Sequence, residues 1–281
     1  MSKTCKLSKR GLALFYSLKN RFEIGVDEAG RGPMFGRVYA AAVVLPRDAE
    51  KFNHDAMRDS KKIKSIKNMK AIADHIRENA LAYSVCYEDE NTIDEINIRQ
   101  ATHKAMKRAI FETHQQLIER FMNDPTNDIH ITKYNETDEF LLIDGNDFTP
   151  FTYFDEKTNK LVEIPHITVE GGDNKFTSIA AASILAKYDR DTYVTDLCEE
   201  YPILKERYAI DSNKGYGTKK HMDGIKAYGI TKWHRKTFGI CQEYATKLNA
   251  KKEDKREDKR EDKREQRKTI QEIVETTEKV I

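Results

Sequence analysis

The chain has 281 residues, of which 34% are charged and 38% are hydrophobic, and 49 Lys and Arg against 47 Asp and Glu leave a formal net charge of +2. Its longest apolar run, Val38–Leu45, is far shorter than the roughly 20 residues of a membrane-spanning helix, so no membrane partner is expected. The near-zero net charge excludes a global basic field. A nucleic-acid site would therefore have to come from local clusters of charge.

The four cysteines, Cys5, Cys86, Cys198 and Cys241, are far apart in the sequence. No CxxC pair suggests a zinc site, and so few cysteines cannot form a disulfide scaffold. We therefore expect reduced thiols in an intracellular, cytoplasmic protein. Residues 1–10 are basic, but no apolar core with a small-residue cleavage site follows them, so no secretory signal is expected.

Charge repeats mark a change in composition near Lys251. The tetrapeptide Glu-Asp-Lys-Arg occurs three times in register over 253–264, and a segment of this composition cannot build a core. We expect a charged tail over 249–281, helical or disordered, which either solubilises the protein or binds a partner that the sequence does not identify. The remainder divides into a basic segment, 1–21, and one domain, 22–248, which we expect to be monomeric.

The central region alternates strand-like and helix-like segments. A strand over 22–28 leads through a glycine-rich turn to a second, buried strand over 38–46. Ser65 is suited to cap a helix that runs to about Asn79. Apolar patterns predict the later segments: a strand over 80–87, a helix over 92–122, a strand over 140–144 and an alanine-rich helix over 176–198.

This order of segments predicts an α/β domain with a central mixed sheet flanked by helices and with a helical C-terminal part. No GKS or GKT phosphate loop is present in the sequence. The glycines at 30 and 32 do not complete a GxGxxG pattern, and no helix follows them directly. The two common nucleotide-binding folds are therefore not expected.

Acidic residues stand where predicted strands end. Asp27 and Glu28 end the first strand, Asp144 ends a later one, and Asp173 lies just before the alanine-rich helix. A buried carboxylate costs free energy unless it is paired or binds a cation. Carboxylates without Cys or His partners favour Mg²⁺ or Mn²⁺ over zinc, and such clusters support two-metal phosphodiester hydrolysis. The structural alternatives are a simple turn after Asp144 and a helix cap at Asp173.

Basic residues gather in two segments of the domain. Residues 58–70 hold six basic residues and one acid, and residues 214–236 hold seven and one. A charge run of this kind is often only a solvated face. The alternative hypothesis is contact with nucleic-acid phosphates, which position a duplex without reading its sequence.

Six short motifs resemble those of the ribonuclease HII family, in the family's order. The first is IGVDEAGRGP over 24–33, with Gly36 beyond it. The others are DSKK (59–62), LIDGN (142–146), GD (172–173) with IAAASILAK (179–187), NKGYGT (213–218) with His221, and HRKTF (234–238). Together they cover about residues 22–240. The Gly-Arg-Gly of the first motif distinguishes the chain from ribonuclease HIII.

The resemblance implies a ribonuclease H-like fold and an enzyme that cuts the RNA strand of RNA/DNA hybrids. It also implies incision at single ribonucleotides embedded in duplex DNA. Carried over by motif, the metal-binding and catalytic acids are Asp27, Glu28, Asp144 and Asp173, with Mg²⁺ or Mn²⁺ as the cofactor. Asp191 also belongs to a motif, and we interpret it as structural.

The same resemblance implies a set of nucleic-acid-binding residues. Gly30, Arg31 and Gly32 match the loop that recognises the ribonucleotide, and Tyr216 matches a tyrosine that stacks near its sugar. Glycines let backbone amides approach a sugar–phosphate closely, and an arginine binds phosphate with a planar fork. The other expected contacts are Ser60, Lys61, Lys62, Asn146, Lys214, His234, Arg235 and Lys236. We do not expect His221 or His234 to bind a metal.

The chain departs from the family pattern in two internal segments. Residues 123–139 form a long polar segment, expected to be an enlarged loop, and residues 151–166 lengthen the path between two of the acids. Two other functions stay open: a broad hybrid nuclease of ribonuclease HIII type, and a non-catalytic nucleic-acid-binding protein. The intact acids favour catalysis, because pure binding does not need them and they repel phosphate when no metal is bound.

Overall fold

The computed structural model describes residues 6–63, 65–122, 138–156 and 158–246. The predicted tail over 249–281 and nearly all of the predicted loop over 123–139 lie outside these residues. The end of that loop is corrected by the structure, because Glu139 already belongs to a strand.

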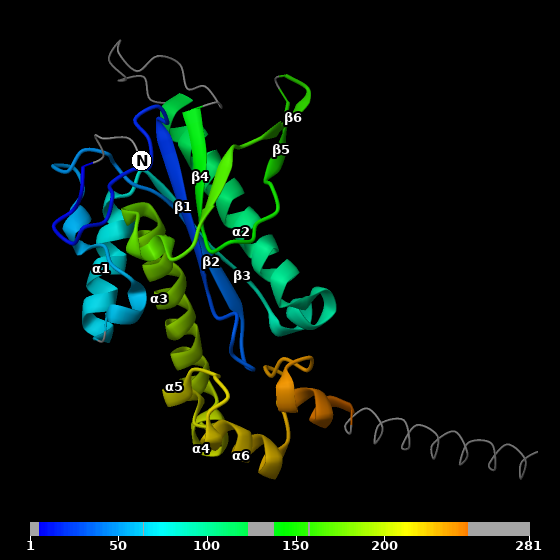
Figure 1. Ribbon diagram of the computed structural model, residues 1–281. Helices are drawn as coiled ribbons and strands as arrows, with labels where there is room; N and C mark the ends of the chain where they lie inside the picture. Colours follow the sequence, from blue (N-terminus) through cyan, green and yellow to red (C-terminus); the bar gives the residue numbers. More distant parts are fainter. Residues whose placement is uncertain (1–5, 64, 123–137, 157, 247–281) are drawn as a thin grey trace, which may run out of the picture.

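A five-stranded mixed sheet forms the centre of the molecule (Figure 1), with the strand order β3-β2-β1-β4-β7. The pairs β1–β2 and β2–β3 are antiparallel, whereas β1–β4 and β4–β7 are parallel. The strands are β1 (Phe22–Ala29), β2 (Val38–Val44), β3 (Ala82–Glu88), β4 (Glu139–Asp144) and β7 (His166–Val169). The predicted mixed sheet is confirmed, and the parallel pair β1–β4 brings two acid-bearing carboxyl ends to one edge.

Helices cover both faces of this sheet (Figure 1): α2 packs on one face, and α1 and α3 pack on the other. Alternation along β1 sends Ile24 and Val26 toward α2 and Gly25 toward α3. A Cβ at position 25 would lie 2.2 Å from the Ser178 carbonyl carbon, so only glycine lets α3 approach this closely. The helices are α1 (Ile66–Asn79), α2 (Glu90–Met122) and α3 (Thr177–Glu200).

The predicted helix cap at Ser65 is confirmed, since its side chain accepts a hydrogen bond from the Asn68 amide at the start of α1. The long helix α2 contains a break that its sequence pattern did not predict. Asn97 has φ 67° and ψ 163° inside it.

The C-terminal part is helical, as predicted, and forms its own small core beyond the end of the sheet (Figure 1). Its helices are α4 (Ile203–Tyr208), α5 (Ile210–Asn213) and α6 (Lys219–Tyr228). Phe35, from the loop between β1 and β2, is fully buried in this core. The β1–β2 loop therefore joins the sheet to the C-terminal helices.

The lengthened path over 151–166 contains an antiparallel hairpin of β5 (Thr152–Asp155) and β6 (Lys160–Glu163). Phe151 and Ile164, at its base, are buried in the core beneath α2. This segment is therefore packed against the domain and returns the chain to β7.

The described part of the N-terminal segment also packs on the domain. Leu12, Leu14 and Phe15 are buried, and Ala13 exchanges backbone hydrogen bonds with the residues that begin α3. Across residues 6–63, 65–122, 138–156 and 158–246, we find no helix whose length and apolar content would let it cross a membrane.

Candidate active site

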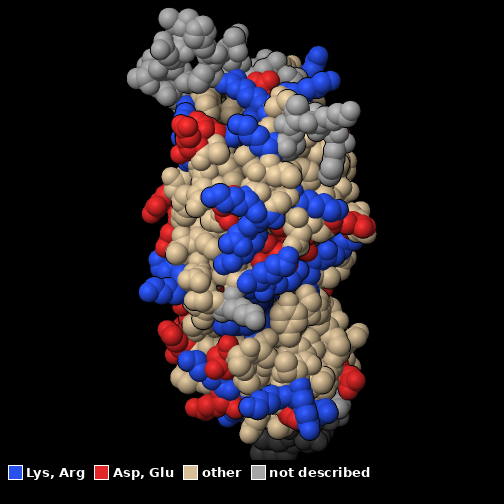
Figure 2. Space-filling model, turned by 60° about the vertical axis from the view of Figure 1, so that its left-hand side comes forward, with Lys and Arg blue, Asp and Glu red and all other residues tan. Residues whose placement is uncertain are grey.

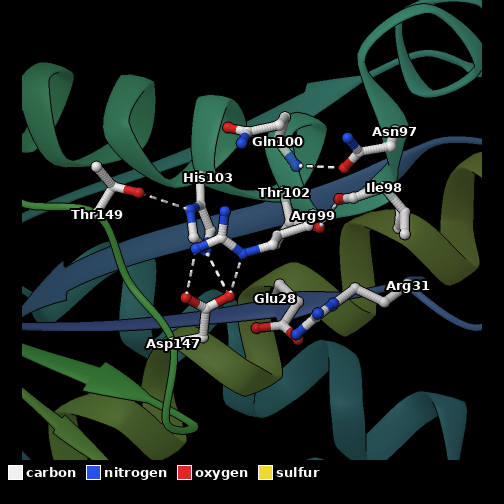
Figure 3. Close-up of polar contacts among 10 residues, drawn as sticks. All are labelled: Glu28, Arg31, Asn97, Ile98, Arg99, Gln100, Thr102, His103, Asp147 and Thr149. Carbon is white, nitrogen blue, oxygen red and sulfur yellow. Dashed lines mark hydrogen bonds and ion pairs between the residues drawn. The ribbon is translucent and has the colours of Figure 1, made fainter.

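The first two acids occupy the carboxyl end of the central strand β1. Asp27 faces α3, is only 5% exposed, and accepts a hydrogen bond from the Ser183 side chain. Its Oδ1 also accepts the Glu28 amide at 2.7 Å. Successive strand residues alternate between the two faces of a sheet, so Glu28 projects to the face opposite Asp27, and Figure 3 shows its carboxylate beside Arg31.

Asp144 ends β4, the parallel neighbour of β1, and its Oδ1 accepts the Gly172 amide at 2.6 Å. A Cβ at position 172 would lie 2.5 Å from Ile179 Cδ1 and 3.2 Å from Asp144 Oδ1. A glycine at 172 therefore lets the turn that carries Asp173 dock against Asp144 without displacing Ile179 or the carboxylate.

Asp173 lies in a short 3-10 turn, Gly172–Asn174, and is 6% exposed. Its Oδ1 accepts a hydrogen bond from Asn174 Nδ2 at 2.9 Å. The structure does not support the capping alternative, because Phe176 is the N-cap of α3 and no side chain bonds there. Asp173 stands beside Asp144 but does not line the cleft into which the other three acids open.

The surroundings of three of these acids disfavour their ionised form and raise their pKa values. Burial, followed by the charges of Glu28 and Asp144, raises the pKa of Asp27 well above its ordinary value. Burial raises the pKa of Glu28, and the Arg31 charge opposes that shift. The pKa of Asp173 is also raised, first by burial and then by Asp59 and Asp144. A divalent cation would relieve this repulsion.

The donor set fits a hard divalent cation, since every candidate ligand is a carboxylate oxygen. Asp27, Glu28 and Asp144 share one cleft, and Asp173 adjoins them. Within the described part of the chain, however, no three Asp, Glu, His or Cys side chains are already gathered closely enough to hold a metal. The acids would therefore have to draw together around the ion.

The cleft itself has a volume of about 440 Å³ and a mixed charge pattern. The three acids lie at one part of its wall, and Arg31, Lys61, Lys187 and Lys214 supply cations around them. Figure 2 shows lysine and arginine side chains gathered across the middle of one face, with carboxylates between them. Basic side chains around one buried and two half-buried acids suit a polyanion whose reacting phosphate meets a metal.

The glycine loop after β1 forms another wall of this cleft. Gly30 has φ +95°, and a Cβ there would lie 2.3 Å from the Nε of the buried Arg190. A Cβ on Gly32 would lie 3.4 Å from the ring of Tyr216, which is 51% exposed. The structure thus brings together the loop and the tyrosine that sequence analysis singled out from segments far apart.

Two predicted phosphate contacts are wrong. Arg235 is fully buried and donates to five backbone carbonyls, and burial, then Arg190, lowers its pKa to about 9. These carbonyls belong to Gly30, Arg31, Pro33, Gly36 and Arg37. His234 is also fully buried, 3.1 Å from His221 between the Nε2 atoms, and cannot reach a duplex. Arg235 fastens the loop between β1 and β2, and His234 packs within the C-terminal core against His221 and Tyr208.

The segment 59–62 lies beside the acids. Ser60 is buried, and its Oγ lies 3.0 Å from Ser183 Oγ, so it supports the wall of the cleft. Lys61 lines the cleft, whereas the exposed Lys62 bonds the side chain of Asn174.

Other predicted contacts are distributed around the cleft. Lys214 lines it, while its Nζ donates to Thr195 Oγ1 at 3.0 Å. Asn146 is exposed just after β4, where Nδ2 donates to Glu170 Oε1 at 3.2 Å. Lys236 is exposed but does not line the cleft.

Sequence reasoning missed three residues of α3 that line the cleft: Ser183, Lys187 and Arg190. Their spacing of four and three residues places them on one face of a helix, so the signal was available. Asp191, interpreted as structural, also lines the cleft, and its Oδ2 accepts a bond from Lys187 Nζ at 2.8 Å.

Solved structures show which fold the chain shares. The ribonuclease H2 of Pyrococcus horikoshii OT3 matches with a TM-score of 0.56 and 19% identity, covering 81% of this chain and 99% of that one. A ribonuclease HIII described as Bst-RNase HIII in complex with Mn²⁺ matches with a TM-score of 0.52 and 18% identity, covering 82% and 71%. The predicted ribonuclease H-like fold is confirmed.

Sequence comparisons then identify the family. The family model named Ribonuclease HII matches residues 24–241. Ribonuclease HII of Parabacteroides distasonis is 42% identical over 235 residues, which cover 84% of this chain and 98% of the relative. The chain belongs to the ribonuclease HII family and is a ribonuclease H enzyme.

Proposed function

We propose that this enzyme is an endonuclease that cuts the RNA strand of RNA/DNA hybrids and incises duplex DNA 5′ to embedded ribonucleotides. Its products would carry 5′-phosphate and 3′-hydroxyl ends. The observation that carries the proposal is one cleft that holds Asp27, Glu28 and Asp144 together with the Gly30–Gly32 loop and Tyr216. Reaction and recognition groups would thus act on adjoining parts of one strand.

Asp27, Glu28, Asp144 and Asp173 would hold Mg²⁺ or Mn²⁺. When two such ions are bound, they supply Lewis-acid activation of water and stabilisation of the leaving 3′ oxygen. The raised pKa values of Asp27, Glu28 and Asp173 support this role, because these crowded carboxylates lack enough positive charge of their own. The Mn²⁺ complex of the structurally similar ribonuclease HIII also supports it.

The glycine loop and Tyr216 would select the ribonucleotide. A 2′-hydroxyl is the group that marks a ribonucleotide within DNA, so a contact must reach that sugar. Gly30 lets the loop pack against Arg190, and a side chain on Gly32 would stand against the exposed ring of Tyr216, so the loop backbone at Gly32 is open toward that ring. Lys61, Lys187 and Lys214 would hold phosphates of the backbone, a role that this proposal assigns to Lys187 from its position in the cleft.

Ribonucleotide removal would place the enzyme in DNA replication and in ribonucleotide excision repair in the cytoplasm. A broad hybrid nuclease of ribonuclease HIII type remains the second candidate, because that protein shares the fold. A non-catalytic binding role is disfavoured by the acids, which would repel phosphate without a metal.

One cleavage assay tests the proposal. Three end-labelled duplexes of the same sequence are compared: DNA with one ribonucleotide, an RNA/DNA hybrid, and DNA alone, each with and without Mg²⁺. We expect metal-dependent cuts in the first two and none in the third. Cleavage of the hybrid alone would favour the ribonuclease HIII type, and duplex binding without any cleavage would favour the non-catalytic alternative.

A further inference from the structure

Part of the N-terminal segment, residues 12–16, lies across the start of α3 and is called the N-terminal strap below. Ala13 pairs with Phe176 as in a parallel sheet. The Ala13 amide donates to the Lys175 carbonyl at 2.8 Å, and the Ala13 carbonyl accepts the Thr177 amide at 3.0 Å. The residues on both sides of Ala13 are buried, so the strap is an integral part of the fold.

The strap takes the place of a side-chain cap on α3. The first amides of a helix have no partner within the helix, and a side chain at the N-cap usually accepts one of them. The N-cap of α3, Phe176, makes no such bond. The Ala13 carbonyl bonds the Thr177 amide instead. The Thr177 hydroxyl donates to the Leu14 carbonyl at 3.4 Å and lies 3.0 Å from His54 Nδ1.

The end of the strap is fixed to the sheet as well. The Tyr16 ring stacks on Phe140 of β4, with 5.6 Å between the ring centroids, and meets Phe176 edge-on at 5.9 Å. The carboxylate of Glu23, in β1, is 7% exposed and accepts the Tyr16 and Ser17 amides at 2.7 and 2.8 Å. The strap therefore connects the start of α3 to two strands that carry acids of the candidate active site.

The turn that carries Asp173 closes on the backbone that the strap fixes. The amides of Lys175 and Phe176 both donate to the Gly172 carbonyl at 2.8 Å. Asp173 lies two residues before Lys175, and it does not line the cleft that the other three acids share. A displacement of Lys175 and Phe176 would therefore move the Asp173 carboxylate relative to Asp144.

We propose that the N-terminal strap positions Asp173 for metal binding, with Ala13 and Tyr16 as the positioning residues. A metal ligand binds well when the groups around it hold its orientation before the ion arrives. Neither positioning residue touches the metal or the substrate, since both act through the backbone at 175–177. This inference rests on the proposed function, because it takes Asp173 as a ligand of the metal used in cleavage.

Titration of the full-length protein with Mn²⁺, followed by electron paramagnetic resonance of the free ion, tests the proposal without any cleavage. Tyr16→Ala removes the ring that contacts Phe140 and Phe176. It should weaken Mn²⁺ binding about tenfold, the lower end of the losses expected when groups that orient a metal ligand are removed. Ala13→Pro removes the amide that bonds Lys175 and should weaken binding similarly. Tyr16→Phe keeps the ring and should bind Mn²⁺ as the wild type does.

A double-mutant cycle with Asp173 separates positioning from a general loss of stability. In an Asp173→Asn background, Tyr16→Ala should change the Mn²⁺ affinity less than about twofold, the usual error of additivity, because no ligand remains to position. Ala105→Gly destabilises α2 on the other face of the sheet and should leave the affinity unchanged. Unchanged affinity in both strap variants, an equal loss in the Asp173→Asn background, or an equal loss in Ala105→Gly would overturn the proposal.

Cleavage gives a second readout. The strap variants should need about tenfold more Mg²⁺ for half of the maximal rate and should reach the wild-type kcat when Mg²⁺ saturates. A loss of kcat that added Mg²⁺ does not restore would contradict the proposal. If the wild-type enzyme cleaves no ribonucleotide substrate, the proposed function fails, while the Mn²⁺ titrations still accept or reject the positioning role. Melting temperatures check folding, and Tyr16→Ala carries the test if Ala13→Pro does not fold.

Discussion

Two buried charged sites in this enzyme are compensated in opposite ways. At the sheet edge, Asp27 is buried beside further carboxylates, and its pKa is raised because burial and like charges disfavour the ionised form. In the C-terminal part, the equally buried Arg235 has five backbone carbonyls as acceptors. The backbone carbonyls satisfy the Arg235 guanidinium from within the protein. The carboxylates at the sheet edge lie among like charges, and their arrangement suits a cation bound from solution.

A buried charge with internal partners stabilises the fold, whereas a buried charge among like charges is available for another role. Arg235 ties the loop between β1 and β2 to the C-terminal helices, and its removal should damage the fold. Burial and like charge make the carboxylates costly to the fold, so under the proposed catalytic role the neutralisation of one of them should damage chemistry while sparing the fold.

The largest effect is expected at Arg235. Arg235→Met should lower the free energy of unfolding by about 3–5 kcal/mol, because several buried carbonyls lose their donor at once. Denaturant unfolding measures it. Lys236→Met, at the exposed neighbour, is the control and should stay within about 0.5 kcal/mol of the wild type. A loss below about 1 kcal/mol for Arg235→Met would show that water can replace the guanidinium.

The second effect concerns chemistry alone. Asp27→Asn and Asp144→Asn should each lower kcat at least ~10²-fold, because a ligand charge is lost. The melting temperature of Asp27→Asn should not fall, since the change removes a buried charge from among like charges. Near-normal turnover of either variant with Mg²⁺ would refute its assignment, and unfolding of Asp27→Asn would show that this carboxylate supports the fold.

The paired histidines add a pH dependence to the C-terminal region. Burial, then His221, lowers the pKa of His234 to about 3, and burial lowers the pKa of His221. Both pKa values are lower in the folded protein than in the unfolded chain. The histidines therefore contribute fully to the free energy of unfolding above about pH 6.5, and this contribution is lost as the pH falls toward 3. Below pH 6.5 the slope should approach about 1.4 kcal/mol per pH unit for His234, and His221 adds to it in the same direction.

Unfolding titrations between pH 7 and pH 5 measure this slope, and the variant His221→Gln with His234→Gln should flatten it. The raised pKa values of Asp27, Glu28 and Asp173 act with the opposite sign, because their stabilisation is present at low pH and is lost as pH rises. The slope is therefore best measured in the Asp27→Asn background. A slope that the histidine variant leaves unchanged would contradict the prediction.

The smallest effect is expected at Tyr216, which contacts both the cleft at the sheet edge and the C-terminal core. Its ring lies beside Gly32 in the cleft, while its carbonyl accepts a bond from His221. Tyr216→Ala should lower kcat/KM about tenfold on DNA with one ribonucleotide, or ~1.4 kcal/mol. The loss on a long hybrid should be smaller, since many registers there offer a 2′-hydroxyl. Fixed salt is needed because phosphate binding depends on it.

Tyr216→Phe separates the ring from the hydroxyl. If the ring alone provides shape selection, Tyr216→Phe keeps the wild-type ratio of kcat/KM between the two substrates. If the hydroxyl bonds the sugar, Tyr216→Phe loses part of that ratio. Equal losses on both substrates for Tyr216→Ala would mean that the residue only positions the backbone.

Much of this protein could be predicted from the sequence, because strand and helix patterns are local. Alternation and apolar runs predicted β1, β2, β3 and β4, and Ser65 predicted the start of α1. The acids could be found because each interrupts or follows an apolar segment. The family motifs then indicated the fold and the enzyme class, both of which the comparisons confirmed.

The tertiary structure decided which charged residues face the cleft. The sequence HRKTF places Arg235 in a basic run that suits phosphate, yet its guanidinium bonds carbonyls about 200 residues earlier in the chain. Lys187 and Arg190 reach the cleft only because α3 packs against β1. Local pattern determines whether a residue lies in a helix or a strand, but the cost of burying a charge depends on partners that only the folded chain brings near.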